Sequence, residues 1–166
     1  MKTACLIALI ALSSPVNAVA ADVDADTEAD RILGVWATEK AEAHVEISRD
    51  AGGYNGTIIW LKEPFYSENE APDLAGQPKV DRENPDPALR DRGVVGLRIM
   101  EGFRYTGRDR WADGTIYDPE NGKTYKCRLL LTGDGELKVR GYVGISLFGR
   151  TSVWTPVLQR IPAAGE

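Results

Sequence analysis

Residues 114–154 read GTIYDPENGKTYKCRLLLTGDGELKVRGYVGISLFGRTSVW, and the turns within this stretch decide the fold. The first turn, Asp118-Pro-Glu-Asn-Gly122, contains the Asn-Gly pair that accepts the positive φ angles of tight hairpins. The second turn contains Gly133-Asp-Gly135. Apolar and polar residues alternate in 124–131 and again in 137–143, as they do in half-buried strands. The stretch therefore predicts consecutive antiparallel strands that are joined by hairpins.

The rest of the chain adds further strand-like segments, and a short helical turn over residues 28–33 precedes the first of them. These segments are residues 34–38, 43–48, 54–61, 94–100, 103–105, 111–117 and 150–157. The count is about eight strands, with no long helix and mostly hairpin-length links. This pattern predicts an all-β fold, an up-and-down antiparallel β-barrel of about eight strands. An open β-sandwich is the alternative, but it needs several long crossings.

A long loop interrupts this pattern between the third and fourth strands. Residues 62–93 contain five prolines, which deny the backbone the donors that a central strand needs. Within the loop, Asn84-Pro-Asp-Pro-Ala-Leu-Arg90 is typical of a short capped helix. Loops of this length in a compact domain are usually functional or disordered, and the short helix favours partial order.

The beginning of the chain has the pattern of a secretory signal peptide. Met1-Lys2 is followed by an apolar run over residues 4–12 and by the small residues Ala18-Val-Ala20. We therefore expect a signal peptide at residues 1–20, a single β-barrel domain at 21–166, and export to the periplasm or the medium. Cys5 lies in the leader, so the mature chain keeps Cys127 alone and has no internal disulfide.

Composition limits the classes of function. The net charge of −5, with 25 acidic against 20 basic residues, disfavours nucleic acid as a partner, because phosphate binding needs a basic surface. His44 is the only histidine, and its place on the polar face of a strand predicts a surface residue. No His, Cys or carboxylate spacing indicates a metal site or a cofactor. Large aromatic residues are usually buried, so we expect core positions for Trp36, Trp60, Trp111 and Trp154.

Two residues on a late strand are the first candidates for ligand binding. Arg140 and Tyr142 are two positions apart and share a face, so together they can hold a carboxylate. The pair resembles the head-group clamp of intracellular fatty-acid-binding proteins. The alternation points both residues outward, unless a bulge at Gly141 or Gly144 turns one of them inward.

Further candidates lie in or near the turns and the long loop. Arg90, Tyr117 and Arg150 are predicted ligand contacts at the barrel mouth, although arginines there can instead tie down the long loop through backbone carbonyls. An acid–base pair could come from the carboxylates Asp81, Asp86, Asp91 and Asp118. For two of these carboxylates a structural role is favoured over a catalytic one: Asp86 is well placed as a helix cap, and Asp118 before a proline is a natural turn residue.

Three blocks of sequence resemble an exported bacterial family known as domain of unknown function 2147. The blocks are residues 84–90, 114–125 and 137–150, and the similarity extends over residues 34–154. The resemblance implies a lipocalin-like β-barrel without an established activity. Family members often carry a cysteine pair near the second hairpin, where this chain has Asp50-Ala-Gly-Gly-Tyr54. They also often continue Trp-Thr-Arg where this chain reads Trp154-Thr-Pro156.

These observations support three functional hypotheses. The first is a non-enzymatic barrel that binds a small apolar or amphipathic ligand, with or without a carboxylate, and needs no cofactor. The second is a structural or protein-interaction barrel of the cell envelope with a filled interior. The third is a hydrolase or isomerase that uses the loop carboxylates.

Overall fold

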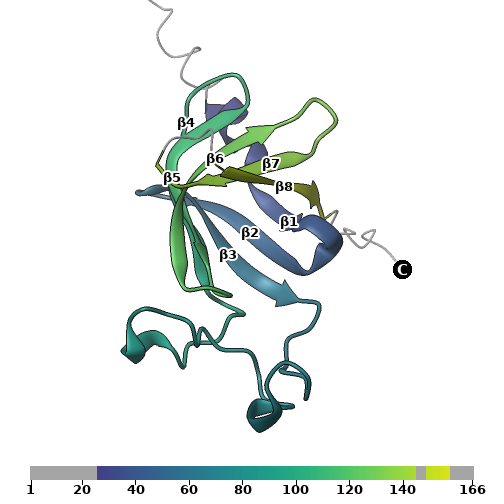
Figure 1. The fold of residues 1–166 in the computed structure, drawn as a ribbon. Coiled ribbons are helices and arrows are strands. Elements are labelled where there is room, and N and C mark those ends of the chain that lie inside the picture. The colour runs from purple at the N-terminus through teal and green to yellow at the C-terminus, as the bar shows by residue number, and fades with distance from the viewer. Residues whose placement is uncertain (1–25, 145–148, 158–166) are drawn as a thin grey trace, which may run out of the picture.

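The computed structural model describes residues 26–144 and 149–157, and these residues form one closed β-barrel (Figure 1). Each strand pairs with the next in antiparallel fashion, and β8 closes the barrel against β1. The strands are β1 Gly34–Ala37, β2 Ala43–Asp50, β3 Gly53–Leu61, β4 Arg98–Tyr105, β5 Arg110–Asp118, β6 Lys123–Leu131, β7 Leu137–Tyr142 and β8 Gly149–Pro156. The predicted eight-stranded up-and-down barrel is confirmed.

Short helical turns complete the described part of the chain. Residues 26–29 form one α-helical turn that continues into the 3-10 helix η1, Asp30–Ile32. The others are η2 Glu39–Ala41, η3 Pro72–Leu74 and η4 Pro87–Leu89. In η4, Asp86 caps the helix by accepting a 3.0 Å hydrogen bond from the backbone N–H of Ala88, as the sequence predicted. None of the helices in the described residues is long and apolar enough to span a bilayer.

The fourth strand differs from the prediction. Residues 94–100 and 103–105 were expected to be separate strands, but one strand, β4, runs through Gly102. Gly102 has a φ of 73°, and the β3–β4 register shifts between Tyr54↔Phe103 and Gly56↔Met100. Asn55 stabilises this bulge by accepting a 3.0 Å hydrogen bond from the Gly102 N–H. The glycine was therefore a bulge within a strand and not the end of one.

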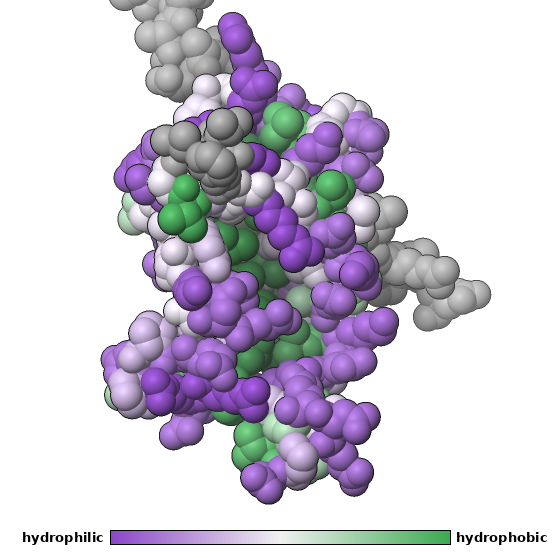
Figure 2. All heavy atoms as spheres, in the orientation of Figure 1, coloured by the Kyte–Doolittle hydropathy of each residue, from purple (hydrophilic) through white to green (hydrophobic). Residues whose placement is uncertain are grey.

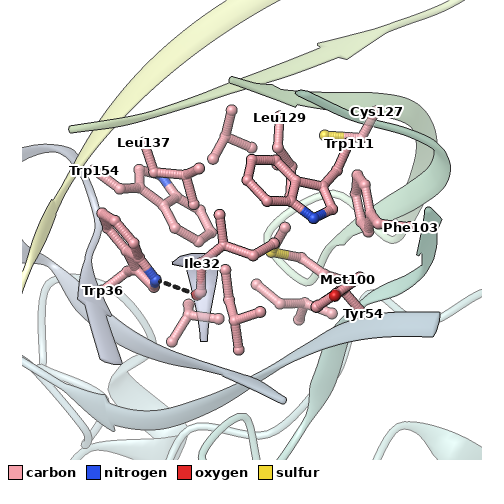
Figure 3. Packing of buried hydrophobic residues seen from close by; sticks show 14 of the residues in the cluster. Ile32, Trp36, Tyr54, Met100, Phe103, Trp111, Cys127, Leu129, Leu137 and Trp154 are labelled. Carbon is pink, nitrogen blue, oxygen red and sulfur yellow. Dashed lines mark hydrogen bonds between the residues drawn. The ribbon is translucent and has the colours of Figure 1, made fainter. Parts of the chain in front are cut away.

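Side chains from all eight strands fill one part of the barrel (Figure 3). The cluster includes Trp36, Trp111 and Trp154 together with Phe103, Met100, Leu129 and Leu137, all buried. Trp60 was expected here, but it is 42% exposed. A register shift in the β2–β3 ladder pairs Val45 with Ile58 and His44 with Trp60, so Trp60 lies on the outer face with His44. Their rings are 4.4 Å apart.

The N-terminal turn closes this filled part of the barrel. Ile32 is completely buried, and its carbonyl accepts a 2.8 Å hydrogen bond from Nε1 of Trp36 (Figure 3). Nε1 of Trp111 donates in the same way to the Ala29 carbonyl over 3.2 Å. Both indole N–H groups thus obtain the partner that a buried tryptophan needs.

The other end of the barrel carries the connections that follow the odd-numbered strands. In an up-and-down barrel, the β1–β2, β3–β4, β5–β6 and β7–β8 loops must meet at one end, which is here called the mouth. The β3–β4 loop, residues 62–97, extends well beyond the strands at this end (Figure 1). The predicted signal peptide, residues 1–20, lies outside the described residues.

Candidate functional site

A cleft of about 610 Å³ lies between the barrel mouth and the β3–β4 loop. Figure 2 shows apolar residues at the bottom of this hollow and hydrophilic residues on both sides of it. The lining comes from the β1–β2 loop, from β2 and β3, from the end of β5 with the β5–β6 turn, and from the β3–β4 loop. A volume of this size is typical of small-molecule sites.

The floor of the cleft is apolar and continuous with the barrel core. Ile58 is buried, belongs to the core cluster and lines the cleft. Ala43 and Leu61 lie beside it at the strand ends, and Val94 covers it from the β3–β4 loop. Burial of apolar surface against such a floor stabilises a bound tail by about 25 cal/mol per Å² of area removed from water.

The walls of the cleft are charged and mainly acidic. Six carboxylates line it, against three basic side chains. The acids are Glu42, Glu63, Glu70, Glu83, Asp118 and Glu120, and the bases are Lys62, Lys79 and Arg82. The two-to-one ratio is well above the ratio of 25 to 20 in the whole chain. The cleft is thus amphipathic, with an apolar floor below an acidic rim.

A buried carboxylate fastens the β3–β4 loop to the barrel wall. Asp81 is fully buried and accepts hydrogen bonds from the Tyr117 hydroxyl at 2.5 Å, the Asn84 amide at 2.7 Å and the Arg92 guanidinium at 3.0 Å. Tyr117 is opposite Thr124 in the β5–β6 ladder, while the neighbouring pair Ile116 and Tyr125 alternates inward. The fastening is therefore on the outside of β5 and leaves the cleft open.

This contact also changes the acidity of the tyrosine. Burial, and then the hydrogen bond to Asp81, raise the pKa of Tyr117 to about 12. Both effects disfavour the phenolate, because its charge would be desolvated beside a carboxylate. Tyr117 is thus a hydrogen-bond donor throughout the ordinary pH range.

A second contact joins the loop to the β5–β6 hairpin. Gly122 has a φ of 68°, and a Cβ atom added there would be 1.9 Å from the carbonyl oxygen of Glu83. Glycine is required on both counts, for the left-handed backbone and for the close approach of the loop. The Asn-Gly turn that the sequence predicted as a hairpin signal is thus also a docking point for the loop.

Arg140 and Tyr142 lie on the outer face of β7. Arg140 is opposite Arg128 and Thr151, whereas the buried Val139 is opposite Leu129. The β6–β7 pairing has no register shift, so the bulge that would turn either residue inward is absent from this ladder. The Tyr142 ring packs under the Arg128 guanidinium at 5.3 Å. Neither Arg140 nor Tyr142 lines the cleft, and their binding of a ligand stays a prediction.

The other predicted ligand contacts lie outside the cleft lining. Nε of Arg90 donates to the Asn84 carbonyl at 2.8 Å, which agrees with a role in tying down the loop. Tyr117 holds Asp81 on the outer wall. Arg150 has a side chain that is 88% exposed and lies 3.8 Å from Glu39. Arg90 and Tyr117 thus both contact Asn84, whose amide donates to the Tyr117 hydroxyl at 3.2 Å, whereas Arg150 lies near Glu39. None of the three lines the cleft, and a ligand role for them stays a prediction.

Three of the four carboxylates that the sequence suggested for an acid–base pair accept hydrogen bonds from neighbouring groups. Of these four, Asp118 lines the cleft, where it accepts hydrogen bonds from the N–H of Glu120 and the amide of Asn121. Asp81 is bound on the outer wall, Asp86 caps η4, and Asp91 is exposed. Within the described residues, no group of three or more His, Cys, Asp or Glu side chains is arranged to hold a metal ion.

The sequence reasoning missed most of the cleft lining. Glu42 follows a tight turn and Glu63 begins the long loop, and neither has a motif around it. The available signal was the length of the β3–β4 loop, because long ordered loops often cover sites. The excess of acids appears only when the β1–β2 loop, the β3–β4 loop and the β5–β6 hairpin meet at the mouth.

Comparisons with known proteins agree with this fold. A family model described as "Uncharacterized protein conserved in bacteria (DUF2147)" matches residues 34–156. The structure is similar to that of protein HP1028 from the human pathogen Helicobacter pylori, which is described as belonging to the lipocalin family. The TM-score is 0.64 and the identity 22%, over 76% of this chain and 83% of that one. The curated proteins contained no match to the sequence.

At this identity the structural similarity concerns the fold, and it agrees with the closed eight-stranded barrel described above. The family match covers every strand of that barrel, from the first residue of β1 to the last residue of β8. The chain therefore belongs to the DUF2147 family of bacterial proteins and has a lipocalin-like barrel.

Proposed function

We propose that this protein is a non-enzymatic barrel that binds a small apolar or amphipathic molecule in the cleft at its mouth. The observation that carries the proposal is the 610 Å³ cleft, because its apolar floor continues the barrel core while the core itself is filled. A ligand seated there covers the partly exposed Ala43 and Leu61 from water and remains reachable from solvent at the rim. Of the four candidate carboxylates, only Asp118 lines the cleft, which favours binding over catalysis by an acid–base pair there.

The test is titration with Nile red, an uncharged apolar dye whose fluorescence rises when it leaves water. The wild-type protein should bind the dye saturably at one site. Ala43→Trp should abolish this binding, because Ala43 lines the cleft and an indole fills the space above the floor. Ser48→Trp is the matched control, since Ser48 is exposed on the same strand. Absence of dye binding to the wild type, or equal binding to Ala43→Trp, would refute the proposal.

Export is part of the proposal and is supported by the signal-peptide pattern in residues 1–20. The mature chain should be found in the periplasm or the medium of the bacterium that makes it. Its first residue, determined by N-terminal sequencing, should be Ala21. A cytoplasmic protein that retains Lys2 would contradict export.

A second candidate, interaction with another protein, is favoured by one observation. Ile59, Trp60 and Phe65 are large apolar residues at the end of β3 and in the loop that follows, and they are 41%, 42% and 54% exposed. Exposed apolar surface can mark an interface. Sedimentation velocity over a range of concentrations should then show association of the wild type that Phe65→Ser weakens. A monomeric wild type at all concentrations would exclude self-association.

A further inference from the structure

The charge of the cleft indicates which head group its ligand carries. The sequence pointed to a carboxylate held by Arg140 and Tyr142, but these residues lie on the outer face of β7. The cleft itself has six acidic and three basic side chains around its apolar floor. If the cleft binds a ligand, as proposed above, the charges of its lining determine which head group it prefers.

Two of the three basic side chains in the lining are already paired. Nζ of Lys79 lies 2.9 Å from the Glu70 carboxylate, within the β3–β4 loop. Nε of Arg82 lies 3.3 Å from the Glu83 carboxylate, and its guanidinium packs 5.6 Å from the Tyr66 ring centre. In each pair the two opposite charges cancel locally, and both pairs lie within the β3–β4 loop. They leave little positive charge to attract an anion.

The remaining charges in the lining are mostly negative. Glu42, Glu63 and Glu120 form no side-chain hydrogen bond or ion pair with the residues that the structure describes. Asp118 accepts hydrogen bonds within the β5–β6 turn but has no basic partner among the ion pairs of the described residues. Lys62 is the one basic side chain of the lining outside the two ion pairs. These carboxylates come from the β1–β2 loop, the β3–β4 loop and the β5–β6 turn, so they surround the opening. Their field at the rim favours a cation, and low-dielectric walls strengthen it.

We propose that the cleft binds an amphipathic amine, with its ammonium group at the acidic rim and its aliphatic tail on the apolar floor. The ammonium stays close to water, so binding does not require full removal of its hydration shell. The tail covers the partly exposed Ala43, Leu61 and Val80 of the lining. The acidic rim disfavours fatty acids, whose carboxylates would meet like charges.

A matched series of eight-carbon compounds tests this inference by isothermal titration calorimetry at pH 7. Octylammonium, 1-octanol and octanoate share a tail and differ in charge. Octylammonium should bind at least about threefold more tightly than octanol, and octanoate should bind most weakly, as expected for partly exposed charge pairs. Raising the salt concentration from 20 mM to 500 mM should weaken octylammonium binding and leave octanol binding unchanged, since salt screens exposed charges.

Variants then locate the charge. Glu42→Gln combined with Glu120→Gln should weaken octylammonium binding about three- to tenfold without changing octanol binding, because both side chains line the cleft on different loops. Glu46→Gln is the matched control, since Glu46 is exposed on the outer face of β2, and it should change neither affinity. Circular dichroism checks that each variant is folded.

The outcomes separate the two proposals. If octanoate or octanol binds as tightly as octylammonium, the inference about the amine is overturned while ligand binding in the cleft stands. If no member of the series binds, both proposals fall. An octylammonium affinity that is the same in the double variant and in Glu46→Gln would also overturn the acidic rim as the cause.

Discussion

The hydroxyl oxygen of Tyr117 lies 2.5 Å from Oδ1 of Asp81, although 36 residues separate them in the sequence. This hydrogen bond joins the outer face of β5 to the β3–β4 loop. Asp81 is fully buried, so each of its partners offsets part of the cost of removing a carboxylate from water. The loop beside the cleft is thus held on the outer face of the barrel, by a tyrosine that does not itself line the cleft.

Replacing the tyrosine should loosen this anchor. Tyr117→Phe removes the hydroxyl and leaves a buried carboxylate oxygen with one partner fewer, which costs about 1–3 kcal/mol of unfolding free energy. Urea unfolding followed by tryptophan fluorescence measures the change. Tyr125→Phe is the control, because its hydroxyl receives a 3.3 Å hydrogen bond from the exposed Asn121, and it should cost less. Equal losses in the two variants would contradict the role of Asp81.

The same pair predicts a change of stability at high pH. The pKa of Tyr117 is about 12 in the folded protein and about 10 in an unfolded chain. The folded state therefore keeps the proton longer, so the contribution is fully present below pH 10 and is lost as the pH rises to 12. The difference in unfolding free energy between the wild type and Tyr117→Phe should be constant from pH 7 to 9 and should shrink above pH 10. A difference that stays constant up to pH 11.5 would disprove this linkage.

The close approach at Gly122 can be tested with a methyl group. Gly122→Ala places a Cβ against the Glu83 carbonyl and forces alanine into a left-handed conformation, at a cost of about 2–4 kcal/mol. Gly133→Ala is the matched control, because nothing lies within 4 Å of its added Cβ and its φ is not positive. That variant should stay within about 0.5 kcal/mol of the wild type. Thermal unfolding of both variants distinguishes a steric contact from a general glycine effect.

The N-terminal turn should contribute to the stability of the barrel. Ile32 is completely buried, so Ile32→Ala should cost about 2–5 kcal/mol through lost burial and a cavity. The adjacent Leu33 is 40% exposed, and Leu33→Ala should change stability by less than about 0.5 kcal/mol. Chemical unfolding provides the comparison. If both variants lose the same free energy, the turn does not close the barrel as described.

Cys127 should be unreactive in the folded protein. Burial raises the pKa of its thiol to about 12, so both the thiolate fraction and access to the sulfur are low. In a Cys5→Ser variant, where Cys127 is the single thiol, labelling by iodoacetamide at pH 8 should be at least about 100-fold slower than in urea. Comparable rates in buffer and in urea would show that the β6 interior is open to solvent.

Local patterns in the sequence predicted the barrel because they follow from backbone geometry. The alternation around Leu129 and Val139 identified the inward faces of β6 and β7, and the Asn121-Gly122 pair located a hairpin. Alternation fails where a bulge changes its phase. Strict alternation along β3 would place Trp60 on the same inner face as Ile58. The register shift beside His44 instead places Trp60 on the outer face of the barrel.

The cleft could not be predicted by the same means. Its lining is assembled from residues as distant as Thr38 and Glu120, and no short-range rule determines which loops meet. The hydrogen bond between Asp81 and Tyr117 has the same origin, since a long loop can place a carboxylate on any nearby wall. The sequence identified the β3–β4 loop by its length and prolines. The position of the loop over the mouth, and the acidic residues that line the cleft there, are known only from the folded chain.

The filled core gives the cleft a fixed bottom. Ile58 forms the floor and belongs to the same buried cluster as Trp36, Trp111 and Trp154. An alkyl chain that enters from the mouth reaches this bottom after a set number of carbons, and any further carbon stays in water. Affinity across a homologous series should therefore rise with each methylene and then level off. The packed core below Ile58 would thus limit the length of the alkyl chain that the cleft can cover.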